Sequence, residues 1–265
     1  NTNSNYKFIK GDISSSDLVL HVLNEYNINY VIHFAAQSHV DSSYKTSIQH
    51  TIDNTLGTHY LLETIKQYNK VERIIHVSTD EVYGDTLSGS KREDAPLKPS
   101  NPYAATKSAA EQLVHAWGRT YGVAYIICRS SNNYGYGQHE EKLIPRTIDL
   151  TLRGEKMTVH GDGSYSREWT FARDNCEGVL LALERGRTGT VYNISAGEMV
   201  DNLTIIKKII ILLEKPENHY TFVANRVGQD IRYSVASDEI KKLGWEPCMS
   251  LDKYLPELIQ RYKKL

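Results

Sequence analysis

Hydrophobic residues along the chain alternate between short continuous runs and runs with helical spacing. A continuous apolar run of strand length is typical of a strand buried on both faces of a parallel sheet. The pattern predicts strands at residues 6–10, 30–36, 73–79 and 124–130, and helices after Ser15 and Ser16, at 54–68 and at 103–121. Strands and helices that alternate in this rhythm predict an α/β fold of the Rossmann type, with a doubly wound parallel sheet.

The pattern becomes less regular beyond Asn133. The elements expected there are a turn at 161–164, a short strand at 191–194, and helices at 203–213 and after Ser250. We therefore expect a first domain over residues 1–133 and a smaller α+β lobe over residues 134–265 that closes over it. The strand at 191–194 is a candidate to return to the first sheet.

Composition narrows the possible partners. The 265 residues are 40% hydrophobic and carry a formal net charge of −1, which gives no electrostatic reason to expect nucleic acid or an acidic membrane surface. No apolar run approaches the ~18 residues of a membrane-spanning helix. Cys128, Cys176 and Cys248 are too widely spaced for a disulfide framework, and the first residues do not resemble a signal peptide, so we expect a cytoplasmic protein. The histidines lack ligand spacing, so no metal is expected.

Polar residues follow four of the predicted strands. In a doubly wound parallel sheet, ligands bind beyond the carboxyl ends of the strands. The residues at those ends are Asp12 and Ile13, Ala36 to Ser38, Thr79 to Glu81, and Asn132 with Asn133. One such segment would mean little, but four together predict a site at one edge of the sheet.

Two groups of residues there could carry chemistry. Tyr103 and Lys107 lie four apart on a predicted helix and therefore share one face. A nearby ammonium favours phenolate and lowers a pKa that starts near ~10, so Tyr103 could act as a base. Asp80 and Glu81, directly after Thr79, could divide into an acid and a base if their surroundings separate their pKa values. Both patterns also occur on ordinary protein surfaces.

Longer motifs carry a resemblance to a known family. They are H-F-A-A-Q-S-H-V-D at 33–41, S-T-D-E-V-Y-G-D at 78–85, N-P-Y-A-A-T-K at 101–107, S-N-N-Y-G at 131–135, E-K-L-I-P at 141–145 and H-G-D-G at 160–163. In order and spacing, over essentially the whole chain, they resemble the dTDP-glucose 4,6-dehydratases, which are extended short-chain dehydrogenases. The T-D-E-V-Y-G segment is the specific signal, because sugar epimerases of that superfamily usually lack the Asp-Glu pair.

The resemblance implies an NAD-dependent lyase reaction. Tyr103, assisted by Thr79 and Lys107, would take the proton of the hexose 4-hydroxyl while hydride passes to NAD. Glu81 would then remove the C5 proton, and Asp80 would protonate the departing C6 hydroxyl. Return of hydride to C6 would give a 4-keto-6-deoxy sugar.

The resemblance also implies the ligand-binding residues. Those for NAD are Asp12, Ile13, Ala35, Ala36, Tyr103, Lys107 and Asn133. Those for a nucleoside-diphosphate hexose are Ser38, Thr79, Asn132, Lys142, Leu143, Arg167 and Asn202. Arg167 suits a diphosphate because guanidinium can bind phosphate oxygens bidentately. The resemblance further implies a homodimer in which the helices at 54–68 and 103–121 pair across subunits, with Leu113, Ala116 and Trp117 as apolar surface.

The chain departs from the family in three places. No glycine-rich G-x-G-x-x-G segment follows a strand, and the strand ending at Asp12 resembles the family's third. We therefore expect that two βα units, on the order of 60 residues at ~30 per unit, are missing from this chain. Asp53 stands where a Thr near the cofactor is usual, and Gln229 where a His near the diphosphate is usual.

Other functions stay open from the sequence. UDP-glucose 4,6-dehydratases share the Thr-Asp-Glu motif, so the sequence does not separate UDP-glucose from dTDP-glucose. A nucleotide-sugar 4-epimerase would need neither Asp80 nor Glu81, and their presence argues against it. A non-catalytic nucleotide-sugar-binding module is supported only by the absence of the glycine-rich segment.

Overall fold

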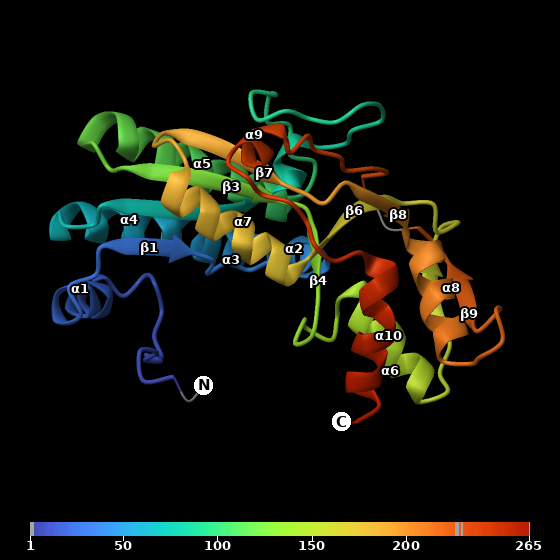
Figure 1. Cartoon of the computed structure of the whole chain (residues 1–265). Coiled ribbons are helices and arrows are strands. Elements are labelled where there is room, and N and C mark those ends of the chain that lie inside the picture. The colour runs from blue at the N-terminus through green and yellow to red at the C-terminus, as the bar shows by residue number, and fades with distance from the viewer. Residues whose placement is uncertain (1–2, 226–227, 229, 265) are drawn as a thin grey trace.

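A four-stranded parallel sheet forms the centre of the larger part of the molecule (Figure 1). The computed structural model describes residues 3–225, 228 and 230–264. The strands lie in the order β1 (Tyr30–His33), β2 (Arg73–Thr79), β3 (Tyr125–Ser130) and β7 (Thr190–Ile194). β7 pairs in parallel with β3, so the chain returns to the first sheet after the excursion through the second lobe.

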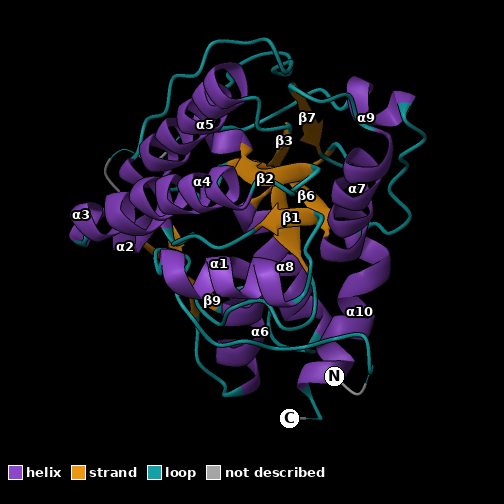
Figure 2. Cartoon of the chain, turned by 90° about the vertical axis from the view of Figure 1, so that its left-hand side faces the viewer, coloured by secondary structure: helices purple, strands orange, loops and turns teal. Residues whose placement is uncertain are grey.

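Helices cover both faces of this sheet (Figure 2). On one face lie α4 (Gly57–Tyr68) and α5 (Pro102–Tyr121), and on the other lies α7 (Ala172–Arg185). Neighbouring residues of a strand point to opposite faces, so Ile74 packs with the α4 and α5 side chains and Ile75 with those of α7. Both are fully buried, as expected for a doubly wound sheet.

A helical segment runs into α4 from the carboxyl side of β1. It consists of α2 (Val40–Lys45), α3 (Ser47–His50) and a π-helical turn (Thr51–Leu56), and α1 (Ser16–Glu25) packs beside α4. The helix predicted at 54–68 therefore begins earlier than its apolar spacing suggested. A π-turn has more residues per turn than an α-helix, which disturbs that spacing.

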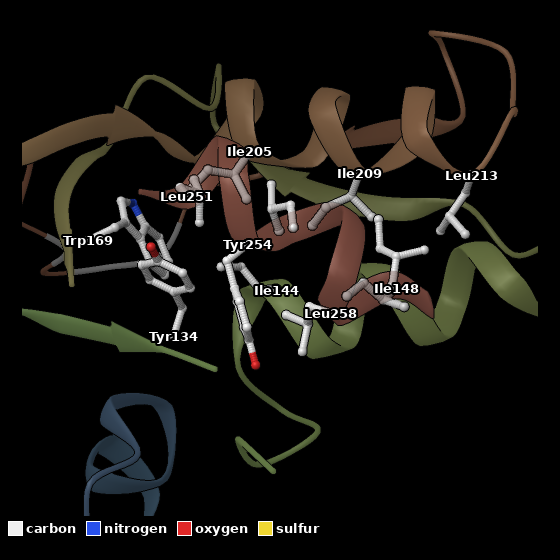
Figure 3. Close-up of a cluster of buried hydrophobic side chains, with 12 residues drawn as sticks. Tyr134, Ile144, Ile148, Trp169, Ile205, Ile209, Leu213, Leu251, Tyr254 and Leu258 are labelled. Carbon is white, nitrogen blue, oxygen red and sulfur yellow. The ribbon is translucent and has the colours of Figure 1, made fainter. Parts of the chain in front are cut away.

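The second lobe is built on two small sheets and three helices at one end of the molecule (Figure 1). One sheet contains β4 (Asn132–Tyr134), β6 (Ser166–Phe171) and β8 (Glu198–Asp201), and the other β5 (Met157–His160) and β9 (Tyr220–Val223). The helices are α6 (Leu143–Leu152), α8 (Asn202–Leu212) and α10 (Leu251–Tyr262), and the short α9 (Asp238–Lys242) packs near β7. Apolar side chains of the three lobe helices point toward one another (Figure 3), and the predicted apolar face of α10 is buried there.

The strand predicted at residues 6–10 does not form. That prediction is wrong, because a strand needs a hydrogen-bonded neighbour and this segment has none among the described residues. Its apolar residues are left in solvent, with Phe8 at 73% exposure. β1 also ends at His33 rather than at the predicted residue 36, and the residues after it are exposed.

A buried ion pair joins the middle of α5 to the sheet. Arg129 of β3 donates to Glu111 of α5 from Nε at 3.1 Å and from Nη2 at 2.7 Å, and both side chains are almost fully buried. The guanidinium also stacks on the ring of Tyr83, whose hydroxyl donates to Asn193 Oδ1 of β7 at 2.8 Å. This network fixes α5 against β3 and β7 at the same time.

Glu111→Ala should lower the free energy of unfolding by about 3–5 kcal/mol, because Arg129 would stay buried without a counter-charge. Urea denaturation monitored by circular dichroism measures this loss. Glu177→Ala removes the acidic partner of the exposed pair with Arg173, 3.0 Å apart, and should change stability little. Equal effects of the two substitutions would contradict a special role for the buried pair.

Candidate active site

The carboxyl end of β2 brings three polar residues into a defined turn. Thr79 ends the strand and caps a 3-10 helix formed by Asp80–Tyr83, since its Oγ1 accepts the Glu81 N–H at 3.3 Å. Asp80 is buried, and Glu81 is half-buried at the wall of a cleft. The strand end therefore directs one carboxyl group into the protein and the other toward a ligand-sized space.

Helix α5 begins at a strong local signal. Asn101 has extended backbone, and its Oδ1 accepts the Ala104 N–H at 2.8 Å, with Pro102 in the first turn. This start places Tyr103 and Lys107 one turn apart on the same face, as their spacing predicts. Both side chains are buried.

The pKa of Tyr103 is shifted in the direction opposite to the prediction. Burial, and after it the charge of Glu81, raises the pKa of the Tyr103 phenol; Asp80 adds to the rise, and a hydrogen bond with Thr79 opposes it. The ammonium of Lys107 donates to a backbone carbonyl of β2 at 2.8 Å, and burial lowers the lysine's own pKa to about 8. The prediction of a lowered phenol pKa is therefore wrong for the chain alone, because burial and two carboxyl groups raise this pKa and Lys107 is not among the groups that lower it.

Asp80 is held in conditions that favour its neutral form. Burial, and then the charges of Glu81 and Glu168, raise the pKa of Asp80 well above its usual value. Thr79 donates to Asp80 Oδ1 at 3.3 Å, while Oδ2 is buried without a hydrogen-bond partner among the described residues. A protonated carboxyl with a free oxygen can donate a hydrogen bond or a proton to a group that comes next to it.

Several neighbours of Glu81 oppose the effect of burial and favour the charged form of its carboxyl group. Burial raises the pKa of Glu81, but a hydrogen bond from Asn101, the charges of Arg167 and Lys142, and a hydrogen bond from Tyr233 all lower it. Neighbouring carboxyl groups in such different surroundings can act as an acid and a base. The tertiary structure thus places the two adjacent carboxyl groups in different electrostatic surroundings.

The Glu81 side chain lines the cleft between the sheet and the second lobe. Among the predicted substrate residues, those that line it are Asn132, Lys142, Leu143, Arg167 and Asn202. Lys142 Nζ donates to the backbone carbonyl of Ser38 at 2.8 Å, which ties the cleft to the segment after β1. Thr79 and Ser38 do not line the cleft itself. The fold thus brings five of the seven residues to one surface from distant parts of the sequence.

Three further residues of the site were not predicted from the sequence. Arg167 stacks on the ring of Tyr233 at 4.3 Å and donates to the Asp230 carbonyl at 2.9 Å. Asn101 donates to Glu81 Oε2 at 2.9 Å. An Asn before Pro is typical of a helix start and could have been singled out. Tyr233 and Asp230 lie in an irregular segment whose pattern carries no such signal.

None of the predicted cofactor residues lines this cleft. Asp12 forms a local turn in which Oδ1 accepts from the Ser14 backbone at 2.8 Å. Ala35 and Ala36 are exposed after β1, and Asn133 Oδ1 is buried without a partner among the described residues.

Two residues of this chain, Asp53 and Gln229, differ from those usual in the family, and the structure describes only the first of them. Asp53 accepts hydrogen bonds from Gln37 and Gln49, at 3.0 and 2.8 Å, so its carboxylate is held by neighbouring side chains. Gln229 lies outside the described residues.

The predicted cofactor residue Ile13 lies against Gly57, where an added Cβ would stand 3.1 Å from Ile13 Cδ1.

Two possible features are absent from residues 3–225, 228 and 230–264. No group of three or more His, Cys, Asp or Glu side chains is arranged to hold a metal ion. No helix in the same part of the chain combines the length and apolar character needed to cross a membrane.

The chain resembles known proteins over most of its length. The family described as GDP-mannose 4,6 dehydratase matches residues 1–258. The dTDP-glucose 4,6-dehydratase of Haemophilus influenzae is 40% identical over 283 residues, a match that covers 98% of this chain and 83% of that protein.

A plant relative is much longer. The Arabidopsis thaliana protein named as a trifunctional UDP-glucose 4,6-dehydratase, UDP-4-keto-6-deoxy-D-glucose 3,5-epimerase and UDP-4-keto-L-rhamnose-reductase is 43% identical over 263 residues. The match covers 97% of this chain, and the chain spans 39% of the length of that relative.

A solved structure shares the fold. The crystal structure of a dTDP-glucose 4,6-dehydratase from Streptomyces venezuelae, with NAD bound, has a TM-score of 0.96 and 37% identity, covering 100% of this chain and 81% of that one. Because the family match and these similarities extend over nearly the whole chain, the chain belongs to the GDP-mannose 4,6 dehydratase family, with dTDP-glucose 4,6-dehydratases among its relatives.

Proposed function

We propose that the protein is an NAD-dependent lyase that converts dTDP-glucose to dTDP-4-keto-6-deoxyglucose. The observation that carries this proposal is the pair Asp80 and Glu81, whose surroundings differ although they are adjacent in sequence. Relatives named as dTDP-glucose 4,6-dehydratases support the substrate, and the plant relatives make UDP-glucose the alternative. A 4-epimerase has no need of an acid and a base at this position.

Residues at the carboxyl edge of the sheet fit an NAD molecule. Asn133 Oδ1 is a buried acceptor whose partner is missing among the described residues, and Ala35 and Ala36 leave room for close approach. In this proposal these residues, with Asp12, Ile13, Tyr103 and Lys107, hold the cofactor within residues 1–133. When bound, NAD supplies a hydride acceptor and donor and a positively charged ring.

Oxidation at C4 requires a base at the 4-hydroxyl. Tyr103 takes that role, because it is buried beside Thr79 and shares a helix face with Lys107. The phenol needs added positive charge to ionise at neutral pH, since burial and Glu81 raise its pKa. Lys107, hydrogen-bonded to the backbone of β2, keeps an ammonium near the site up to a pH of about 8.

Elimination across C5 and C6 then uses the two carboxyl groups in opposite forms. The ketone at C4 acidifies the C5 proton, which passes to Glu81, and the C6 hydroxyl leaves as water with the proton of Asp80. Hydride addition at C6 and protonation at C5 complete the 4-keto-6-deoxy product. Asp80 takes the role of the acid because it is the more deeply buried of the two and has fewer stabilising donors, so it keeps a proton to a higher pH.

The second lobe, residues 134–265, would hold the nucleoside diphosphate. Arg167 and Lys142 supply positive charge in the cleft, while Asn132, Leu143 and Asn202 line it. Ser38 would contact the sugar from the segment after β1, which Lys142 already binds. The strand 190–194 lies in the first sheet, so the two functional parts are interlaced in sequence.

The full-length protein with NAD and dTDP-glucose should form a 4-keto-6-deoxy product, detected by its absorbance in alkali. UDP-glucose under the same conditions identifies the nucleotide that is preferred. A galactose product in place of the keto sugar would favour an epimerase, and no conversion of either substrate would rule the proposal out.

Two variants separate the steps of this reaction. Glu81→Gln should slow turnover by ~10²–10⁴-fold, as is typical when a general base is lost, yet still allow NADH absorbance on mixing. Tyr103→Phe should suppress that absorbance, because the ring cannot accept the hydroxyl proton. Normal exchange of the C5 hydrogen with solvent in Glu81→Gln would show that another group is the base.

Asp80→Asn should stabilise the fold at neutral pH while it slows turnover by ~10²–10⁴-fold. The folded protein keeps the Asp80 proton to a higher pH than the unfolded chain, so stability falls as pH rises from about 3.9 through the folded pKa. Asn cannot ionise and avoids this loss, so the gain should shrink toward pH 4. Thermal unfolding at pH 4 and pH 7 measures it. The exposed Asp94→Asn serves as control, and a destabilised Asp80→Asn at pH 7 would contradict a raised pKa of Asp80.

A homodimer and a cytoplasmic location complete the proposal. Ile48, Ile52, Leu56 and Tyr60, spaced by four along α3, the π-turn and α4, are each at least 41% exposed and form an apolar stripe. The earlier candidates Leu113 and Trp117 pack partly against the core, and Ala116 is exposed.

Leu56→Lys should convert the protein from dimer to monomer in sedimentation velocity at micromolar concentration. A lysine at the centre of the stripe would bury charge in the contact. The control Leu180→Lys places the same charge on an exposed residue of α7, on the opposite face of the sheet. Wild-type protein that sediments as a monomer would refute the dimer.

A further inference from the structure

Asn101 uses both ends of its side-chain amide in different elements. Its Oδ1 accepts the Ala104 N–H at 2.8 Å and caps α5, and its Nδ2 donates to Glu81 Oε2 at 2.9 Å. The cap fixes which way the amide faces, because only the oxygen can accept an N–H. The amino group is therefore directed to the carboxylate, and the side chain is only 6% exposed.

We propose that Asn101 is a positioning residue that orients Glu81 for proton abstraction and fixes its place relative to Tyr103. The inference rests on the proposed function in one respect, the assignment of Glu81 as the base. The geometry that supports it is independent of that assignment.

The hydrogen bonds at Glu81 distinguish its two oxygens. Oε2 accepts from Asn101 at 2.9 Å and lies 3.4 Å from the hydroxyl of Tyr233. The Tyr233 hydroxyl makes its shorter contact, 2.6 Å, with Asp230 Oδ2, so Asn101 is the principal donor. Oε1 has no hydrogen bond within the described part of the chain. It is the oxygen left available to a substrate proton.

The same residue sets the geometry between two proton acceptors. Tyr103 follows Asn101 by two residues in the first turn of α5, and the cap determines where that turn begins. In the proposed reaction Tyr103 and Glu81 act on neighbouring carbons of one sugar ring. Errors of ~1 Å in such placement can cost on the order of 10²-fold in rate. One side chain that binds both elements is a direct means to hold that distance.

The donor also favours the charged form of Glu81. A hydrogen bond to a carboxylate opposes the effect of burial on its pKa, and Asn101 is the largest of the influences that lower the pKa of Glu81. Loss of the donor should therefore raise the pKa at which Glu81 becomes a base. The acid limb of the pH–rate profile should move to higher pH.

Asn101→Asp and Asn101→Ser separate this role from helix capping. Both residues are good N-caps, so α5 should keep its start. Asp replaces the donor by an acceptor next to Glu81, and the Ser hydroxyl is too short to span the same distance. We expect a melting temperature near that of the wild type in Asn101→Ser, and a lower one in Asn101→Asp, where a second buried carboxyl group faces Glu81. Turnover at pH 7 should fall about 10–100-fold, the range of a hydrogen bond to a charged group. The acid limb should shift to higher pH in both variants, and further in Asn101→Asp.

Two readouts distinguish positioning from a structural effect. Exchange of the C5 hydrogen with solvent should fall more than the formation of NADH on mixing, because Glu81 acts only in the first of these. Carbon-13 NMR of labelled glutamate, with Glu81→Gln to assign the signal, reports the titration of Glu81 without any activity.

Three results would overturn the inference: an unchanged Glu81 titration in both variants, equal losses in C5 exchange and NADH formation, or a loss of activity in Asn101→Ser explained by a fall in melting temperature. If wild-type protein makes no 4-keto-6-deoxy sugar, the proposed function fails. The NMR titration then still decides whether Asn101 controls Glu81.

Discussion

The position of helix α5 against the sheet governs everything that the site can do. The helix carries Tyr103 and Lys107 at its start, and a buried ion pair from Glu111 to Arg129 holds it to β3 further along. Burying two charges is costly unless they are paired and hydrogen-bonded, so arrangements of helix and strand that separate the pair are strongly disfavoured. The ion pair thereby helps to set the position of α5 along the sheet.

The carboxyl groups at the end of β2 depend on this register. Asp80 and Glu81 are adjacent in the chain, yet the turn after Thr79 directs one into the protein and the other to the cleft. Burial by itself raises both pKa values. The difference arises from donors and cations that reach Glu81 from α5 and from the second lobe. The difference in surroundings between the two carboxyl groups is therefore a property of the assembled fold, and the burial of ionisable groups generally opposes stability.

The second lobe contributes through the same contacts. Arg167 of β6 stacks on Tyr233, and Tyr233 in turn lies near Glu81 and binds Asp230. A residue suited to bind a diphosphate is thus two contacts away from the proposed base. Lys142 makes a similar link from the start of α6 to the segment after β1. The packing of the lobe against the sheet and the charges around Asp80 and Glu81 are consequently parts of one arrangement.

The sequence by itself determined the class of fold and most of the elements, because strands and helices buried on apolar faces leave a periodic pattern. β2 at 73–79, α5, α8 and α10 lie where the pattern predicts them, and the motif residues Thr79 to Glu81 and Tyr103 with Lys107 meet at one edge as strand order requires. Periodicity could not reveal that residues 6–10 find no neighbouring strand, since pairing is a property of two segments. It also gave the wrong direction for the pKa of Tyr103, because burial and the charges of Glu81 and Asp80 arise from three-dimensional proximity. The two hydrogen bonds of Asn101 show this difference most clearly. The helix cap on Ala104 is local and can be predicted from the sequence, because Asn before Pro is typical of a helix start. The hydrogen bond to Glu81 forms only once β2 and α5 have packed together.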